Sequence, residues 1–200
     1  MSLLRICREN LAIVLIDVQD YFLQSMCGDP EPLLVRLEQI LIISEWFDLP
    51  VLATLEEPIE RKGRLPERLQ RLFPERGGLF PKQTYNLCAE DEIKVALSGL
   101  QRRQMAVVGG ETDVCVLQSV SGMLSEGFDV FLLEDCLYSS EPFVSPALER
   151  MTQSGAVPCT YKSLFYELCG TEDPAVWEDA HQRAVTNGFI PVESLPPRKD

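Results

Sequence analysis

Residues 11–17 read Leu-Ala-Ile-Val-Leu-Ile-Asp, six apolar side chains in a row followed by a carboxylate. A run of this length without polar alternation is typical of a strand buried on both faces of a parallel sheet. From Pro32 to Phe47 apolar residues recur at three- and four-residue spacing, with a proline at the start and Pro50 just beyond the end. This spacing predicts a helix. The N-terminal part of the chain therefore predicts a strand followed by a helix.

The same unit recurs along the chain. Further strands are predicted at 51–55, 78–81, 105–108, 129–133 and 156–159, and further helices at 90–101, 113–126, 144–154, 163–169 and 174–185, with a short helix inside the polar connection 61–72. Strands that alternate with helices predict parallel units joined by right-handed crossovers. We therefore expect an α/β fold, a three-layer αβα sandwich whose parallel sheet has about six strands in the Rossmann-like order 3-2-1-4-5-6. We expect a single domain over residues 1–200, with its core at about 10–185 and a C-terminal tail at 186–200.

Charge and hydropathy narrow the kinds of partner. The 18 basic and 31 acidic residues give a net charge of −13, and no segment gathers a basic stripe. Binding to nucleic acid or to an anionic membrane is disfavoured, because neutralising phosphates requires clustered lysine and arginine. No apolar run approaches the roughly 20 residues of a membrane helix, and the first ten residues contain no long apolar region that would indicate a secretory signal. We therefore expect a cytoplasmic protein.

The cysteine and histidine content limits the chemistry. The seven cysteines form an odd set with no C-x-x-C pair, which disfavours both a disulfide framework and a cysteine zinc site. The single histidine, His181, falls in a polar, late helical stretch. A nucleophile in this chain is therefore expected to use a base other than histidine.

Two of the predicted strands are directly followed by residues whose side chains could take part in catalysis. Asp17 directly follows the most apolar strand, and Gly109-Gly-Glu-Thr-Asp-Val-Cys115 directly follows the strand at 105–108. In open parallel sheets, ligands bind beyond the carboxyl ends of the strands. If these strands are neighbours, a carboxylate and a thiol meet at the binding edge.

Both residues have a second interpretation. Cys115 at the first turn of a helix would have its pKa lowered from about 8.5 toward roughly 3.5–7.5, whereas its position between two valines is typical of a small buried hydrophobe. Asp17 is a candidate general base or a turn residue at the end of a strand. Lys82 reads, from composition alone, as a surface lysine.

Taken together and in order, three blocks give a specific resemblance. They are Leu15-Ile-Asp-Val-Gln-Asp-Tyr-Phe22, then Pro81-Lys82, then Val107-Val-Gly-Gly-Glu-Thr-Asp-Val-Cys-Val116. Over roughly residues 10–185 the chain resembles the isochorismatase-like cysteine hydrolases, which include nicotinamidases, N-carbamoylsarcosine amidases and ureidoacrylate amidohydrolases. The stretches 149–157 and 163–170 look most like the isochorismatase-domain subgroup of uncertain substrate.

The resemblance implies a catalytic triad of Asp17, Lys82 and Cys115. It also implies a cis peptide bond between Gly110 and Glu111, and an oxyanion hole made by the backbone N–H groups of Glu111 and Cys115. The implied reaction is hydrolysis of a small amide or ureido C–N bond through a Cys115 acyl-enzyme, in an oligomer of two or more copies. On this hypothesis Lys82 lies between Asp17 and the thiolate and offsets their repulsion.

Two aromatic residues are candidates for the substrate pocket. Phe22 fits the family's pocket-wall aromatic, although core packing explains it as well. Tyr138, with Phe143 nearby, follows the fifth strand and either caps a pocket or belongs to a subunit interface.

Departures from the family pattern bear on the substrate and on metals. Nicotinamidases have an Asp-x-His metal motif after the second strand, whereas this chain reads Thr54-Leu-Glu-Glu-Pro58. We therefore expect no cofactor and no metal, and we interpret Glu56 and Glu57 as an exposed loop rather than as ligands of a hard cation. After Lys82 the chain continues Gln-Thr-Tyr-Asn instead of toward the family's Ser-Ala-Phe, which leaves the pocket shape open.

Two other functions compete with the hydrolase. One is a catalytically silent family member that acts as a binding or scaffold protein, since a fold does not determine a function. The other is a redox-reactive thiol at Cys115, which the lack of a nearby resolving cysteine disfavours.

Overall fold

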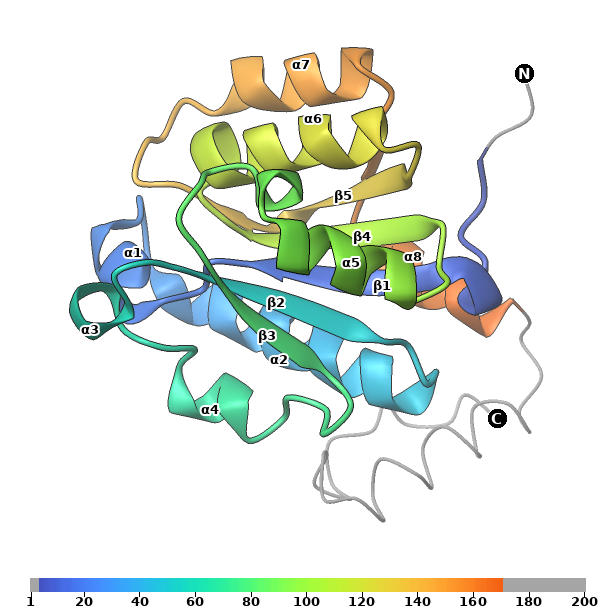
Figure 1. The fold of residues 1–200 in the computed structure, drawn as a ribbon, viewed down its shortest axis with the longest axis horizontal. Coiled ribbons are helices and arrows are strands. Elements are labelled where there is room, and N and C mark those ends of the chain that lie inside the picture. The colour runs from blue at the N-terminus through green and yellow to red at the C-terminus, as the bar shows by residue number, and fades with distance from the viewer. Residues whose placement is uncertain (1–3, 171–200) are drawn as a thin grey trace, which may run out of the picture.

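The computed structural model describes residues 4–170. Its centre is a six-stranded parallel sheet in the order β3-β2-β1-β4-β5-β6, as predicted (Figure 1). The strands are β1 Leu11–Ile16, β2 Val51–Glu56, β3 Gly78–Lys82, β4 Gln104–Gly110, β5 Asp129–Tyr138 and β6 Val157–Cys159. The α-helices are α1 Asp20–Ser25, α2 Pro30–Trp46, α3 Ile59–Lys62, α4 Glu67–Gln70, α5 Asp91–Gly99, α6 Leu117–Ser125, α7 Ser145–Gln153 and α8 Tyr161–Cys169. The predicted helix at 174–185 and the tail at 186–200 lie outside the described residues.

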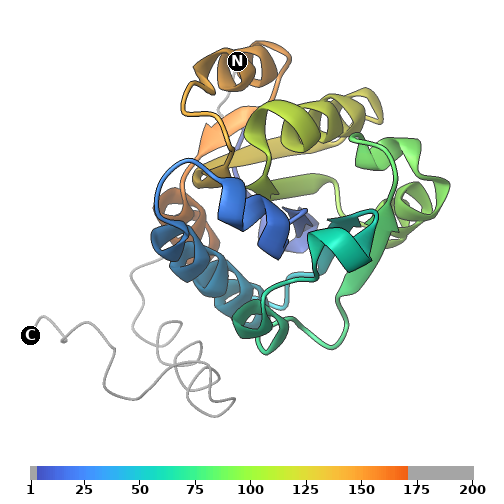
Figure 2. The ribbon, with the colours of Figure 1, turned by 90° about the vertical axis from the view of Figure 1, so that its left-hand side faces the viewer.

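The sheet is covered on both faces by helices, so two cores form. Ile13 and Leu15 of β1 are buried in the core that α2 and α8 cover. Val14 and Ile16 of the same strand are buried in the other core, with α5, α6 and α7. Figure 2 shows these two helical layers on opposite sides of the sheet. A strand that meets apolar neighbours on both faces needs apolar side chains at every position, which explains the unbroken run in β1.

Capping residues mark the starts of α2 and α8, the two helices that cover the same face of the sheet. Asp29 caps α2 by accepting a hydrogen bond from the backbone N–H of Glu31 at 3.0 Å, and Pro30 occupies the first helical position. Thr160 and Ser163 form a capping box at the start of α8. Caps of this kind satisfy backbone N–H groups that have no partner within the helix.

The register of the sheet brings the ends of four strands together. Ile16 pairs with Thr54 of β2 and with Gly109 of β4, and Glu56 pairs with Lys82 of β3. The carboxyl ends of β1 to β4 therefore share one edge of the sheet, and α1 and α3 contact each other beside that edge (Figures 1 and 2).

Three elements differ from the predictions. The six-residue helix α1 was not predicted, because it is too short to show a helical period. The predicted helix at 113–126 is divided into a π-helical turn, Thr112–Val116, and α6. β5 extends past its predicted end through the polar pair Glu134 and Asp135, where its pairing with β4 shifts register.

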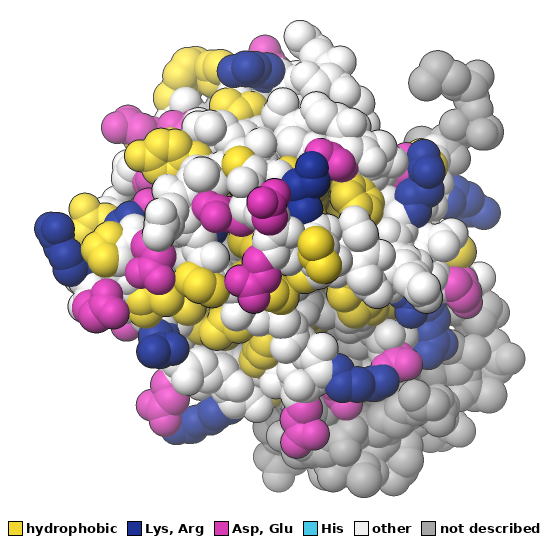
Figure 3. All heavy atoms as spheres, viewed as in Figure 1, with side chains coloured by type: hydrophobic (Ala, Val, Ile, Leu, Met, Phe, Trp, Pro, Cys, Tyr) yellow, Lys and Arg dark blue, Asp and Glu magenta, His cyan; other side chains and the backbone are white. Residues whose placement is uncertain are grey.

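The face of the molecule shown in Figure 3 has no single dominant character. On the face in Figure 3, acidic and basic side chains are interspersed, with apolar patches between them. The described residues contain no helix with the length and apolarity that a membrane span requires.

Candidate active site

Three side chains that are far apart in the sequence meet at the carboxyl edge of the sheet. Asp17 follows β1, Lys82 ends β3, and Cys115 lies in the π-helical turn after β4. Lys82 Nζ lies 2.6 Å from Asp17 Oδ2 and 3.5 Å from Cys115 Sγ. All three residues are buried, and Cys115 is 3% exposed. The structure thus places the predicted carboxylate, ammonium and thiol in contact, while their catalytic roles remain a prediction.

Asp17 is held on all sides. Its backbone has a φ of 48°, a left-handed conformation that is uncommon outside glycine and better tolerated by aspartate. Its Oδ1 accepts a hydrogen bond from Thr54 Oγ1 at 2.7 Å, and its Oδ2 pairs with the Lys82 ammonium. Its backbone carbonyl accepts a hydrogen bond from Tyr138 Oη at 2.8 Å. Neighbours on β2 and β3 therefore orient the carboxylate, and Tyr138 on β5 fixes the backbone that carries it.

Glu56 is a fourth member of the cluster, and its interpretation as exposed loop is wrong. Glu56 is the last residue of β2 and is 7% exposed. Its Oε2 accepts a hydrogen bond from Cys115 Sγ at 3.0 Å and lies 3.5 Å from Lys82 Nζ. The signal that could have identified Glu56 is the one that identified Asp17, a carboxylate at the carboxyl end of a strand next to the central strand.

The side chain of Gln19 fixes the backbone of Glu56. The Gln19 amide accepts a hydrogen bond from the Glu56 N–H at 2.7 Å and donates to the carbonyls of Glu56 at 3.2 Å and Gly63 at 2.8 Å. On the solvent side, Lys62 Nζ forms an ion pair with Glu56 Oε1 and donates to the Glu57 carbonyl at 2.8 Å. Hydrogen bonds thus fix the backbone of Glu56, and an ion pair with Lys62 holds its carboxylate.

The loop after β3 holds Lys82 in place. The Lys82 ammonium donates to the carbonyl of Thr84 at 3.0 Å. The carboxylate of Glu90 accepts hydrogen bonds from the backbone N–H groups of Gln83 and Thr84 at 2.8 and 2.9 Å, and the Thr84 hydroxyl donates to it as well. These contacts turn the chain directly after Lys82 and keep its ammonium pointed into the cluster.

The electrostatic state of Cys115 differs from the expectation. Burial raises the pKa of the Cys115 thiol well above its ordinary value, and the charges of Asp17 and Glu56 raise it further, while Lys82 opposes them. The expected lowering by a helix N-terminus fails because Cys115 lies inside a π-helical turn, walled by protein and beside two carboxylates. At neutral pH the Cys115 thiol therefore keeps its proton.

Burial and neighbouring charges also shift the pKa values of the other three ionisable side chains of the cluster. Burial raises the pKa of Asp17 in spite of Lys82 and Thr54, so this carboxylate is a stronger base than an exposed aspartate. Burial also acts to raise the pKa of Glu56, but the hydrogen bonds from Cys115 and Lys62 outweigh it and lower the pKa. Burial acts to lower the pKa of Lys82, and the surrounding negative charges raise it overall. Lys82 is therefore a permanent cation, and Asp17 is the better proton acceptor of the two carboxylates.

Asp17, Glu56 and Cys115 offer potential metal-ligand atoms within 4.8 Å of one another. The Lys82 ammonium lies within 3.5 Å of the thiol and of both carboxylates. This protein cation supplies the positive charge that such a cluster requires, and it occupies the position from which an ion would contact all three side chains.

The end of β4 shows the backbone features that the resemblance implied. The peptide bond between Gly110 and Glu111 is cis. Gly109 has a φ of 108°, and a Cβ atom on Gly110 would lie 2.5 Å from the ring of Tyr138, so both positions require glycine. The Glu111 carboxylate accepts a hydrogen bond from the Ser140 N–H at 3.0 Å. The oxyanion role of the Glu111 and Cys115 N–H groups stays a prediction.

The two predicted pocket aromatics both lie near the cluster. Phe22 is buried in the core on the α2 side, with Lys62 Nζ 5.6 Å from its ring centroid. Tyr138 is buried against Gly110 and lines a cavity of about 270 Å³ together with Thr112 and Ser139. Tyr138 thus supports the backbone of the site and borders a cavity, while substrate contact by either ring remains a prediction.

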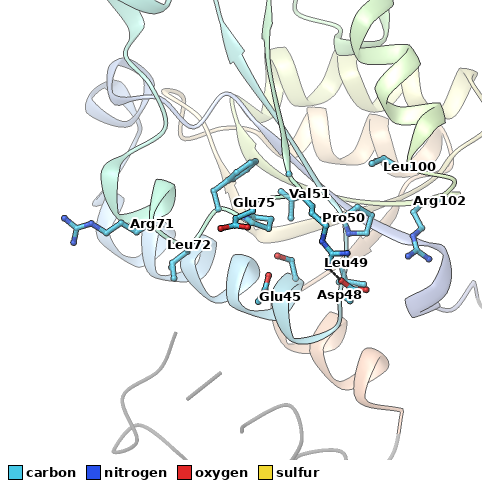
Figure 4. A pocket seen from close by; sticks show the side chains of 15 residues that line it. Glu45, Asp48, Leu49, Pro50, Val51, Arg71, Leu72, Glu75, Leu100 and Arg102 are labelled. Atoms are coloured by element: carbon cyan, nitrogen blue, oxygen red, sulfur yellow. Dashed lines mark hydrogen bonds and ion pairs between the residues drawn. The ribbon is translucent and has the colours of Figure 1, made fainter. Parts of the chain in front are cut away.

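A larger cavity, of about 640 Å³, lies elsewhere (Figure 4). It is bordered by Val51, the first residue of β2, and by Gly77, which directly precedes β3. These residues mark the amino edge of the sheet, at the opposite end of the strands from Asp17 and Lys82. The charged cluster and this cavity are therefore separate features.

Comparisons with known proteins identify the family of this chain and agree with its fold. The isochorismatase domain family matches residues 11–163. The chain is 30% identical over 171 residues to isochorismatase domain-containing protein 2A of Mus musculus, covering 84% of this chain and 79% of the relative. Its fold is similar to YcaC of Pseudomonas aeruginosa, solved with covalent acrylamide (TM-score 0.83, 23% identity, 94% and 95% of the two chains). It is equally similar to YcaC of Escherichia coli, described as an octameric hydrolase of unknown specificity (TM-score 0.83, 22% identity, 94% of each chain). Because the family match spans most of its length, the chain belongs to the isochorismatase domain family.

Proposed function

We propose that this protein is a cysteine hydrolase that cleaves a C–N bond of a small amide or ureido compound. The observation that supports this function most strongly is the contact of the Lys82 ammonium with both the Asp17 carboxylate and the Cys115 thiol at the carboxyl edge of the sheet. The related YcaC proteins add support, since one is described as a hydrolase and another was solved with covalent acrylamide.

The first half of the proposed reaction forms an acyl-enzyme. Asp17 takes the proton of the Cys115 thiol, and Sγ attacks the substrate carbonyl carbon. The C–N bond then breaks, and Asp17 gives the proton to the departing nitrogen, which leaves as ammonia or an amine. Proton transfer from Cys115 to Asp17 leaves the net charge of the cluster unchanged. Lys82 and Lys62 balance two negative charges before the transfer, on Asp17 and Glu56, and two after it, on Cys115 and Glu56.

The second half restores the thiol. Water attacks the thioester carbon while Asp17 accepts its proton, and the C–S bond breaks to release a carboxylic acid. The proton returns to the sulfur, so the sum is amide plus water to acid plus amine. The N–H groups of Glu111 and Cys115 would receive the negative charge that develops on the carbonyl oxygen in both halves.

The proposed enzyme needs neither metal nor organic cofactor for these steps, because Lys82 supplies the cation and Asp17 handles the protons. We also propose that it assembles as a homo-oligomer, in line with the octamer described for YcaC of Escherichia coli. The substrate would be a small molecule, since the cluster is buried and Cys115 is accessible over only a few per cent of its surface.

Ammonia or amine release from a panel of small primary amides and ureido acids tests the function. We expect release by the wild type and by Cys7→Ser, a control at a cysteine near the N-terminus and away from the cluster. Cys115→Ser should abolish it, and Asp17→Asn should reduce it by roughly 10²–10⁴-fold, the usual contribution of a general base. Turnover that survives Cys115→Ser would overturn the proposed function.

A further inference from the structure

We propose that Glu56 is a positioning residue of this site, whose carboxylate accepts the Cys115 S–H hydrogen bond and thereby holds the nucleophile in its neutral resting form. The importance of this contact for catalysis rests on the proposed function. It concerns a group outside the Asp17, Lys82 and Cys115 set, and it makes its own prediction about the thiol.

The geometry favours Glu56 over Asp17 as the resting partner of the thiol. Cys115 Sγ lies 3.0 Å from Glu56 Oε2 in hydrogen-bond geometry. The oxygens of Asp17 are already engaged, Oδ1 by the Thr54 hydroxyl and Oδ2 by the Lys82 ammonium. A hydrogen bond from the neutral thiol to a carboxylate stabilises the protonated sulfur, and the same carboxylate repels a thiolate.

Glu56 is also built to stay where it is. The Gln19 amide clamps its backbone, and the Lys62 ammonium, on a side chain that is 20% exposed, pairs with its second oxygen. Burial acts to raise the pKa of the Glu56 carboxyl, but the hydrogen bonds from Cys115 and Lys62 lower it overall, which keeps the carboxylate ionised and able to accept the S–H hydrogen bond. The proton leaves the sulfur for Asp17, whose pKa is raised by burial, once a substrate replaces the contact with Glu56.

Few charged groups face the thiol. They are Asp17 after β1, Glu56 on β2 and Lys82 on β3, with Lys62 behind Glu56. The phenol of Tyr138 on β5 stays neutral, because burial raises its pKa far above 10. Removing the Glu56 charge therefore leaves one carboxylate and two ammonium groups around the sulfur.

The rate of Cys115 alkylation by iodoacetamide as a function of pH, followed by peptide mapping, tests this assignment. Glu56→Gln should move the midpoint of the profile about one pH unit lower, which is about tenfold faster alkylation well below the midpoint. Lys62→Met, on a partly exposed side chain, should move the midpoint the other way, because it removes a cation. Glu57→Gln, one residue along and outside the cluster, is the matched control and should keep the wild-type profile.

The midpoint separates this role from packing alone. A variant that merely loosens the site would react faster at every pH with an unchanged midpoint, and that result for Glu56→Gln would overturn the proposal. If Glu56→Gln does not fold, an unchanged or lowered midpoint in Lys62→Met overturns it instead. The alkylation assay needs no substrate. If the wild type releases no ammonia, that result contradicts the proposed hydrolase, whereas the alkylation profiles still decide the Glu56 assignment.

Discussion

The Cys115 sulfur lies among charges that balance when its proton is present. Asp17 and Glu56 contribute two negative charges, and Lys82 and Lys62 contribute two positive ones. A thiolate added to this set would leave a net negative charge in a buried space, which burial makes costly. The thiol therefore stays neutral at rest, and the proposed nucleophile forms only when its proton passes to a neighbouring group.

Thr54→Val tests the hydrogen bond that orients the base. Valine keeps the shape but removes the donor to Asp17 Oδ1, so the pKa of Asp17 should rise further. Because the proposed reaction needs ionised Asp17, the acid limb of the pH–rate profile should move to higher pH, and turnover should fall about tenfold or more. Denaturant unfolding should show a loss of about 1–3 kcal/mol, the usual cost of leaving a buried hydrogen-bond acceptor, here Asp17 Oδ1, without its donor.

Thr152→Val is the matched control for this change. Thr152 lies exposed on α7, where its hydroxyl donates only to the Leu148 carbonyl. Its stability should change by less than about 0.5 kcal/mol, with the pH profile unmoved. An acid limb that stays in place in Thr54→Val would contradict the assignment of Asp17 as the base.

Sequence reasoning located some site residues and missed others for a physical reason. Asp17 and Cys115 stood out because each follows a strand whose apolar pattern is unmistakable. Lys82 was found only through the resemblance, since nothing in its neighbourhood distinguishes it from a surface lysine. Glu56 was missed because two adjacent glutamates before a proline are typical of exposed loop, and only the register between β2 and β3 buries the first of them.

At the scale of elements, the strand ends position the chemistry. β1, β2 and β3 each deliver one charged side chain to the same edge, and β4 delivers the turn that contains Cys115. The parallel sheet with helices on both faces was predictable from the alternation of strands and helices, and its strand order is that of the Rossmann-like arrangement we expected. The π-helical turn was not, because apolar spacing cannot reveal one extra residue within a single helical turn.

Gly109→Ala tests the close contact between β4 and β1. A Cβ atom on Gly109 would lie 2.1 Å from the Ile16 carbonyl oxygen, and the residue has a φ of 108°. We expect the variant to lose about 3 kcal/mol or more of unfolding free energy, since backbone strain and overpacking add.

Gly99→Ala provides the comparison for Gly109→Ala. A Cβ atom on Gly99, the last residue of α5, has no neighbour within 4 Å. Alanine is the better helix former, so this variant should gain up to about 1 kcal/mol. Denaturant unfolding of both variants should give effects of opposite sign, and a neutral Gly109→Ala would contradict the described packing.

At the scale of the whole molecule, the buried thiols link stability to pH. Burial raises the pKa of Cys88 to about 11, and burial raises the pKa of Cys136 and Cys115 further. Above about pH 8.5 unfolded thiols lose their protons while the folded ones keep theirs, so the unfolded state binds fewer protons. The stabilisation from keeping these thiols buried and neutral is complete below that pH and is lost as the pH rises.

Unfolding free energy measured from pH 8 to pH 11 tests this linkage. Each such thiol should make the stability fall by about 1.4 kcal/mol per pH unit between its unfolded and folded pKa values. Cys88→Ala should show a shallower fall than the wild type, and Cys27→Ala, at an exposed thiol, should keep the wild-type slope. Equal slopes in Cys88→Ala and the wild type would contradict the burial of this thiol in its neutral form.

The proposed hydrolase function depends on a covalent bond between Cys115 and the carbonyl carbon of a substrate. Mass spectrometry of the intact protein, quenched in acid during incubation with each amide and ureido acid, measures this directly, and peptide mapping locates the added mass. We predict a transient acyl adduct on Cys115 that is absent in Cys115→Ser and does not accumulate in Asp17→Asn. An adduct on another cysteine, or ammonia release with no adduct on Cys115 under any quench condition, would contradict the account.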